Sequence, residues 1–440
     1  MNGRGFNVSR SIFFPFAFLA LLACPAAFAQ DLSVDGQLRD AAANIRNARI
    51  GEAETTLRRL VLRSPLNADA HNLLGIVLEQ KGNTSEAERS YRRALQLSPK
   101  AVSPLANLAA LLAKTGRTLP AIAAFQSVLR IRPNHPEATI NLGFLFLSIR
   151  QFDKAVEFLT KADRIKPNDF ETNLGLGKAL YQTGSFEEAI AKLRAAVAIQ
   201  GNRVEPAYWL GMIALAKNNL APASDYFRES VALGPDHPGA NFMLGEILAR
   251  QNNYSEAKTF YERALQLDST NPAYHIRLGG VYLKQSEFDN AYRIFAIASD
   301  KFPAVAEIHY LFAIAVRAKG ELDLALQALK KALLLKPDYV EAIALTGAVL
   351  IDRNDLMQAE KLLRQAVGLN QNQFNANHDL GRVLVKTRRF AEALPFLQRA
   401  SKIIPDNAEV HYQLYLVFLR LKQPDNAARE LALYKQLYGK

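Results

Sequence analysis

Apolar residues along this chain have the spacing of amphipathic helices, and the pattern repeats every 34 residues. Residues 68–101 form one such unit. Four residues of its first half share one helix face, at i, i+3, i+4 and i+7: His71, Leu74, Gly75 and Leu78. Four residues of its second half also have helical spacing: Ala87, Tyr91, Ala94 and Leu95. The segment Gly-Asn-Thr-Ser-Glu at 82–86 ends one helix and begins the next, and Pro99 ends the second. The unit is therefore predicted to be a helical hairpin.

Three kinds of residue recur with this period. Alanine takes the same place in twelve units: Ala53, Ala87, Ala121, Ala155, Ala189, Ala223, Ala257, Ala291, Ala325, Ala359, Ala393 and Ala427. The position 12 residues earlier is small in all but the last unit: Ala41, Gly75, Ala109, Gly143, Gly177, Gly211, Gly245, Gly279, Ala313, Gly347, Gly381 and then Tyr415. Proline ends many units: Pro65, Pro99, Pro133, Pro167, Pro235, Pro303, Pro337 and Pro405. A fixed period without insertions predicts stacked hairpins that bury their apolar faces against one another.

These motifs resemble the tetratricopeptide repeat (TPR) family. The matching residues are the Leu-Gly pairs that begin at Leu74, Leu142, Leu210, Leu244, Leu278 and Leu380, and the aromatic residues Tyr91, Phe125, Phe227, Tyr261 and Phe295. The resemblance implies an all-α, right-handed superhelical solenoid of about twelve 34-residue hairpins over residues 34–440. Residues 34–67 would be a degenerate N-terminal capping repeat, 68–407 ten repeats, and 408–440 the C-terminal repeat.

Residues 1–29 do not follow the repeat and are predicted to be a cleaved secretory signal peptide. Arg4 and Arg10 precede the apolar run 12–23, and Ala-Phe-Ala at 27–29 has the form of a cleavage site. The run is too short to span a bilayer. Residues 30–33 would then be a short linker, and the mature protein would be bacterial and located in the periplasm or secreted.

The only cysteine, Cys24, supports an alternative location. Leu-Leu-Ala-Cys at 21–24 resembles a bacterial lipobox, in which lipidated Cys24 would make the protein an outer-membrane lipoprotein. Pro25 and the alanine site that follows favour simple cleavage instead. We expect membrane association only if Cys24 is lipidated.

The formal charge is +12, and removal of Arg4 and Arg10 with the signal peptide leaves +10. Basic residues occur in every repeat and are typical of solvated helix faces. They also fit attraction to acidic partners, anionic polysaccharide or a membrane surface. Nucleic acid is not an expected partner of an exported protein.

The TPR resemblance implies that the first helix of each hairpin lines a concave groove. Carrying the family's groove positions onto this sequence gives candidate partner-binding residues that are largely aromatic and aliphatic: Phe144, Leu147, Lys178, Tyr181, Tyr208, Met212, Phe242, Glu246, Arg250, Tyr310, Ile314 and Arg317. A large exposed apolar surface of this kind marks a binding site. The alternative is that coiling of the array packs these side chains between neighbouring first helices.

The sequence contains no recognisable catalytic or metal-binding set. Four of the seven histidines share one repeat position and are expected to pack within the array: His71, His275, His309 and His411. Neighbouring first helices lie about 8–10 Å apart, too far for ligands that must each approach one zinc ion to about 2 Å. We therefore predict no metal, no cofactor and no enzymatic activity.

The prediction is an exported, non-catalytic TPR scaffold that binds a protein or peptide partner through its groove. One alternative is a scaffold for envelope polysaccharide export or outer-membrane assembly, which the basic charge and the lipobox fit. Another is an accessory module of a glycosyltransferase-type enzyme, although no catalytic domain is present. Tyr415 and Tyr434 replace small residues in the last unit, which is tolerable where no thirteenth unit packs. An apolar end face left without a further solvating helix makes self-association through the C-terminal end a further expectation.

Overall fold

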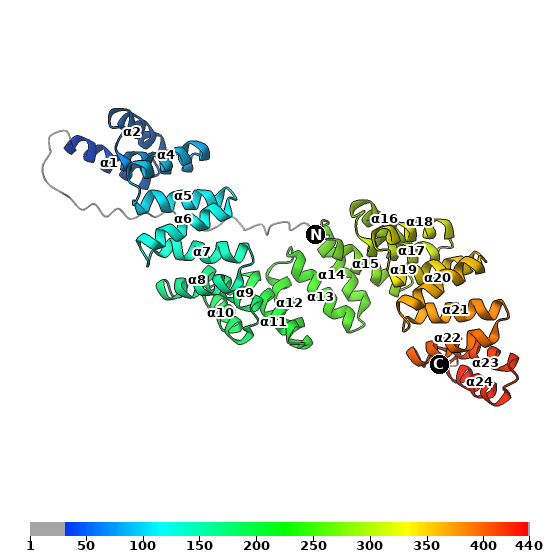
Figure 1. Cartoon of the computed structure of the whole chain (residues 1–440). Helices are drawn as coiled ribbons and strands as arrows, with labels where there is room; N and C mark the ends of the chain where they lie inside the picture. Colours follow the sequence, from blue (N-terminus) through cyan, green and yellow to red (C-terminus); the bar gives the residue numbers. More distant parts are fainter. Residues whose placement is uncertain (1–30, 439–440) are drawn as a thin grey trace. The chain divides into compact units, whose positions relative to one another are not determined.

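A computed structural model describes residues 31–438, and this part of the chain contains 24 α-helices and no β-strand (Figure 1). The first helices of the hairpins are α1 (Asp31–Arg46), α3 (Ala68–Gln80), α5 (Val102–Lys114), α7 (Pro136–Ser148), α9 (Phe170–Gln182), α11 (Val204–Ala216), α13 (Pro238–Arg250), α15 (Pro272–Lys284), α17 (Ala306–Ala318), α19 (Val340–Asp352), α21 (Phe374–Lys386) and α23 (Ala408–Arg420). The second helices are α2 (Ile50–Arg63), α4 (Thr84–Leu97), α6 (Thr118–Ile131), α8 (Phe152–Ile165), α10 (Phe186–Ile199), α12 (Leu220–Leu233), α14 (Tyr254–Leu267), α16 (Phe288–Lys301), α18 (Leu322–Leu335), α20 (Leu356–Leu369), α22 (Phe390–Ile403) and α24 (Pro424–Tyr438). The predicted all-α array of helical hairpins is confirmed.

The helices keep the register of the sequence repeat. From α3 to α23, every first helix begins 34 residues after the previous one, and α2 to α24 do the same. The turn inside each hairpin has one residue in the left-handed region at a fixed place. That residue is glycine in four hairpins, Gly82, Gly116, Gly184 and Gly320, with φ between 77° and 81°. In the others it is Ala48, Arg150, Asn218, Asn252, Ser286, Asn354, Arg388 or Lys422. Glycine is therefore favoured at this turn but not required.

Eight hairpins are closed by a glycine on the first helix that lies against a large residue on the second. A Cβ added to Gly245 would come within 2.8 Å of ring atoms of Tyr261, and one added to Gly211 would come within 2.9 Å of Phe227. The recurring alanines of the second helices are almost fully buried, from Ala53 to Ala427. These contacts explain two of the three recurrent columns of the sequence, the small residues of the first helices and the alanines of the second.

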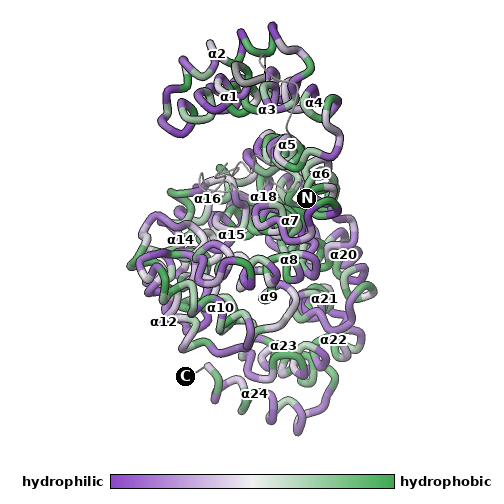
Figure 2. Tube along the Cα trace, turned by 90° about the vertical axis from the view of Figure 1, so that its left-hand side faces the viewer, coloured by the Kyte–Doolittle hydropathy of each residue, from purple (hydrophilic) through white to green (hydrophobic). Residues whose placement is uncertain are grey.

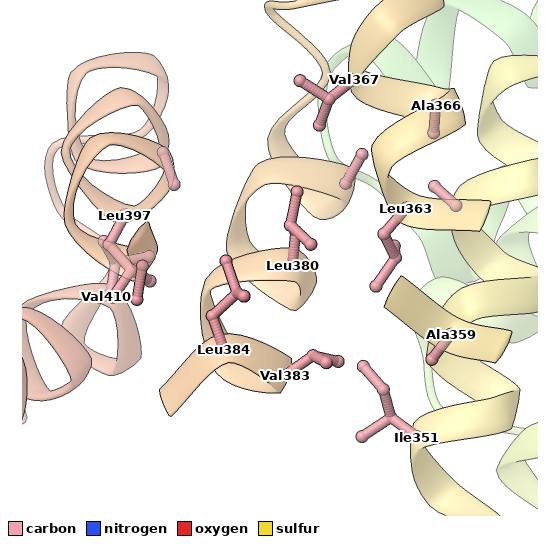
Figure 3. Close-up of a cluster of buried hydrophobic side chains, with 14 of the residues drawn as sticks. Ile351, Ala359, Leu363, Ala366, Val367, Leu380, Val383, Leu384, Leu397 and Val410 are labelled. Carbon is pink, nitrogen blue, oxygen red and sulfur yellow. The ribbon is translucent and has the colours of Figure 1, made fainter. Parts of the chain in front are cut away.

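The helices form two compact units, one ending at Glu229 and one beginning at Ser230, a division that falls within α12. In each unit, the second helix of one hairpin packs on the first helix of the next, and neighbouring first helices also touch. Figure 3 shows this packing in the second unit, where Leu363, Leu380 and Leu397 come from α20, α21 and α22. Hydrophobic and hydrophilic positions alternate along the helices (Figure 2), as expected of amphipathic helices in a stack.

Ion pairs also join neighbouring hairpins. A basic residue at the turn of one hairpin reaches an acidic residue in the first turns of the preceding second helix. The pairs are Lys81–Glu54, Arg117–Glu88, Lys217–Glu187, Lys319–Asp289, Arg353–Asp323 and Arg389–Glu360. Six of the basic residues of the chain therefore stabilise the stacking of neighbouring hairpins.

The predicted signal peptide and Cys24 lie outside the described residues. Within the described residues, no helix combines the length and the apolar character needed to cross a bilayer.

Candidate functional site

The candidate groove residues of the first unit lie on the surface formed by its first helices. They come from three consecutive first helices: Phe144 and Leu147 on α7, Lys178 and Tyr181 on α9, and Tyr208 and Met212 on α11. All six side chains are half-buried. Phe144 lies over the next first helix, because a Cβ added to Gly175 would come within 2.7 Å of its ring. Its ring therefore packs between α7 and α9.

Three of these residues meet around Trp209 of α11. The ring centroids of Tyr181 and Trp209 are 5.3 Å apart with an interplanar angle of 61°, and those of Tyr208 and Trp209 are 5.5 Å apart at 84°. The Lys178 ammonium lies 5.9 Å from the centroid of the Trp209 ring. These edge-to-face arrangements are the favoured geometry of aromatic pairs. We call Lys178, Tyr181, Tyr208 and Trp209 the aromatic cluster.

Trp209 was not among the predicted site residues. It lies one position after Tyr208, outside the groove positions that the TPR resemblance supplies. The one sequence feature that could have identified it as a site residue is that it is the only tryptophan of the chain. Its half-buried ring places it on the same surface.

Charged residues border the aromatic cluster. The Arg203 guanidinium lies 3.5 Å from Glu205 and 4.0 Å from Glu171, and it also covers the Phe170 ring at 4.9 Å. Burial lowers the pKa of the Lys178 ammonium and raises the pKa of the Glu171 carboxyl. Burial also opposes ionisation of Glu205, but a bond from its own backbone N–H and the nearby Arg203 lower its pKa overall. Arg203 thus engages both carboxylates.

The candidate residues of the second unit form separate groups. On α13, the Phe242 ring lies 5.6 Å from that of Tyr261 and 4.8 Å from that of Tyr274. Glu246 accepts a 2.5 Å hydrogen bond from the Tyr261 hydroxyl and pairs with Arg277 at 3.0 Å. Arg250, at the end of α13, is exposed.

The remaining candidates connect α17 to α19. The rings of Tyr310 and Tyr339 are 5.1 Å apart, and Arg317 pairs with Asp352 at 2.7 Å. Ile314 lies between them on α17 and is half-buried. The candidate residues therefore contact one another and their neighbours while keeping part of their surface in solvent. A partner-binding role for them stays a prediction.

Three of the four histidines at the shared repeat position secure the loops between hairpins. The Nε2 atoms of His71, His309 and His411 lie 3.0, 3.0 and 2.8 Å from the carbonyl oxygens of Pro65, Pro303 and Pro405. Because a carbonyl oxygen only accepts, each imidazole donates through Nε2. Asn241 and Asn377, at the same position, donate to Pro235 and Gln371. Among the described residues, no group of three or more histidine, cysteine or acidic side chains is placed to hold a metal ion.

Comparison with known proteins agrees with the repeat pattern. Models described as tetratricopeptide repeat match residues 41–102, 120–171 and 150–214. The model described as "Cilia and flagella-associated protein 70 C-terminal domain" matches residues 213–437, just over half of the chain. Among curated proteins there is no match.

Several solved structures resemble parts of the chain. YrrB, described as a TPR protein with an unusual peptide-binding site, is 23% identical, with a TM-score of 0.39, over 43% of this chain and 97% of its own. PilF of Pseudomonas aeruginosa is 20% identical, with a TM-score of 0.42, over 50% of this chain and 99% of its own. The Cut9–Hcn1 hetero-tetramer of the APC/C is 13% identical, with a TM-score of 0.45, over 87% of this chain and 96% of the matched chain.

Proposed function

The chain belongs to the tetratricopeptide repeat (TPR) family, and from that premise we propose that it is an exported, non-catalytic scaffold that binds a protein or peptide. The observation that carries the proposal is the aromatic cluster on the first-helix surface of the first unit. Its rings are fixed by contacts with one another, yet they remain half-buried rather than fully enclosed.

Such a surface suits recognition for two physical reasons. Tyrosine and tryptophan dominate the energetics of protein interfaces, because each buries a large area at a low conformational cost. Rings that already contact one another lose little further freedom when a partner covers them. The rings of the aromatic cluster would therefore supply most of the affinity, and its Lys178, together with the bordering Glu171 and Glu205, would set the register of the bound segment.

Site-specific photocrosslinking in the native cell tests this role. A photoreactive residue replaces Tyr181 in one variant and Lys361, an exposed residue on α20, in the matched control. We expect a discrete crosslinked protein from position 181 and none from position 361. Equal crosslinking at both positions, or none at position 181, would count against the proposal.

Export to the periplasm or the exterior is proposed from the sequence of residues 1–29. Intact-mass measurement of the protein from its native cell tests it. A start at Gln30 supports simple export, whereas a diacyl or triacyl mass on Cys24 makes the protein an outer-membrane lipoprotein and favours a role in envelope assembly. A full-length mass beginning at Met1 would rule out both.

A further inference from the structure

The basic charge of the chain is concentrated near its N-terminal end. Between Arg89 and Pro136 there are eight lysine or arginine residues and no aspartate or glutamate. Between Thr55 and Ala68 there are three arginines and again no carboxylate. These segments include the C-terminal halves of α2 and α4 and all of α6. Cations near helix C-termini are ordinary, because they interact well with the helix dipole, but that effect does not explain why these two segments contain no carboxylate at all.

The repeat places several of these arginines in one row. Arg59 on α2 and Arg93 on α4 are 34 residues apart and therefore occupy the same face of successive second helices, and both are exposed. The equivalent residue on α6 is Ser127, and the Arg130 guanidinium donates a 2.6 Å hydrogen bond to its hydroxyl. Arg130 thus brings a guanidinium to the place where α6 lacks one.

Three of the four carboxylates on α2 and α4 are already engaged by other cations, the exception being the exposed Glu52 at the start of α2. Glu54 pairs with Arg58 and Lys81, and Glu88 pairs with Arg92 and Arg117. Glu86 pairs with Arg58, which also shows that α2 and α4 are neighbours. Among the described residues, no carboxylate forms an ion pair with Arg59, Arg63, Arg93 or Arg130. Their charge therefore faces solvent.

Two leucines project from the same region. Leu62 is 81% exposed and Leu66 is 74% exposed, and they alternate with Arg59 and Arg63 at helical spacing along α2 and the turn after it. A bound peptide needs a groove in which to bury its own side chains. Leu62 and Leu66 project outward and form no such groove. A fluid lipid interface can instead close around projecting leucines while arginines contact the phosphates beside them.

We propose that Arg59, Leu62, Arg63, Leu66, Arg93 and Arg130, called here the arginine surface, dock the protein on an anionic phospholipid membrane. The guanidinium groups contact lipid phosphates, and the two leucines enter the headgroup boundary. This surface lies on the second helices, so it is distinct from the partner-binding surface of the first helices and leaves that surface free. The inference does not depend on the proposed peptide-binding function or on lipidation of Cys24.

Vesicle co-sedimentation of the full chain tests the inference. One set of vesicles contains equal parts phosphatidylcholine and phosphatidylglycerol, and the other contains phosphatidylcholine alone. The test variant carries Arg59→Gln, Arg93→Gln and Arg130→Gln. The matched control carries Arg194→Gln, Lys330→Gln and Lys361→Gln, which removes the same charge from exposed positions on other second helices. A second test variant carries Leu62→Ser and Leu66→Ser.

We expect binding to the anionic vesicles only, weakened roughly tenfold or more by the triple arginine change, since each arginine contributes near an anionic surface. The control triple variant should bind like the unmodified chain, and the leucine variant should bind more weakly at every salt concentration. The inference is overturned if both triple variants lose affinity equally, if neutral vesicles bind as well, or if a poly-glutamate peptide binds the arginine surface while vesicles do not. All substituted residues are exposed, so unchanged circular dichroism is expected throughout.

Discussion

Gly279 on α15 lies directly against the ring of Phe295 on α16, so that a Cβ at this position would overlap the ring. Phe295 is fully buried. The next residue, Gly280, has no atom within 4 Å of the place where its Cβ would lie. Two adjacent glycines of one helix therefore have opposite packing environments.

Gly279→Ala is expected to destabilise the second unit, whereas Gly280→Ala is expected to stabilise it. Overpacking costs about 1–3 kcal/mol, partly offset by the gain of about 0.5–1 kcal/mol for replacing a helical glycine with alanine. Gly280→Ala brings that gain alone. Urea unfolding of both variants measures the difference, and equal stabilities would show that the hairpin does not depend on this close contact.

The two partners of this contact are visible in the sequence, because the column of small residues and the aromatic residues 16 positions later share one period. The sequence predicted the helices and their register for the same reason. It did not predict that Arg150 and Lys422 adopt the left-handed turn conformation, since neither residue type signals that geometry. Trp209 was missed because it lies beside the family's groove positions, not at one.

The charged surfaces were also beyond the sequence pattern. Which basic residues are used in ion pairs depends on side chains from different hairpins, such as Arg117 with Glu88, 29 residues apart. Only after those pairs are placed can Arg59, Arg63, Arg93 and Arg130 be recognised as arginines without a carboxylate partner. The periodicity fixes where a residue lies, but not what lies opposite it.

Protonation of His275 should destabilise the second unit. Its side chain is nearly fully buried beside Phe302, and burial lowers the pKa of the imidazole below its ordinary 6.5. As the pH falls, the unfolded chain therefore binds the proton before the folded chain does. The stabilisation of the folded state by the neutral His275 imidazole is complete above pH 6.5 and is lost as the pH falls below it. His275→Asn removes the titration and places there the residue that α13 and α21 have at Asn241 and Asn377.

We expect the unfolding midpoint of the unmodified chain to fall more than that of His275→Asn as the pH is lowered from about 7.5 to about 5. Other titrating groups are common to both proteins and cancel in the difference. Denaturant unfolding at several pH values measures it, and parallel curves would show that His275 is protonated equally in both states.

Glu88→Gln should weaken the first unit at neutral pH but not in acid. Hydrogen bonding by Arg117, assisted by Arg92, lowers the pKa of Glu88 to about 2 against burial. A lowered pKa means that the stabilisation is complete above the ordinary value of 4.5 and is lost as the pH falls toward 2.

Because both arginines are exposed to solvent, the expected decrease in Tm from Glu88→Gln at pH 7 is small, about 1–3 °C. It should shrink further in high salt and vanish near pH 2. Thermal unfolding under these conditions measures it. A decrease that persists in acid would indicate that the glutamate acts through packing and not through its charge.

Tyr208→Ala together with Phe242→Ala should abolish partner capture while leaving the helical fold intact. Both rings are half-buried, so each already has part of its surface in solvent. Phe158→Ala with Phe396→Ala is the matched control, because these are half-buried rings on second helices of the same two units. Circular dichroism of both double variants is expected to match that of the unmodified chain, and only the first is expected to lose the crosslinked partner.

Trp209 provides an independent readout for this pair of variants. As the only tryptophan, it reports directly on the aromatic cluster through its fluorescence. Tyr208→Ala removes a ring 5.5 Å away and should shift the emission to longer wavelength, as solvent reaches the indole. If Tyr208→Ala with Phe242→Ala instead loses its helical circular dichroism, these rings are part of the core, and the packing between first helices, not recognition, explains why the first-helix surface is aromatic.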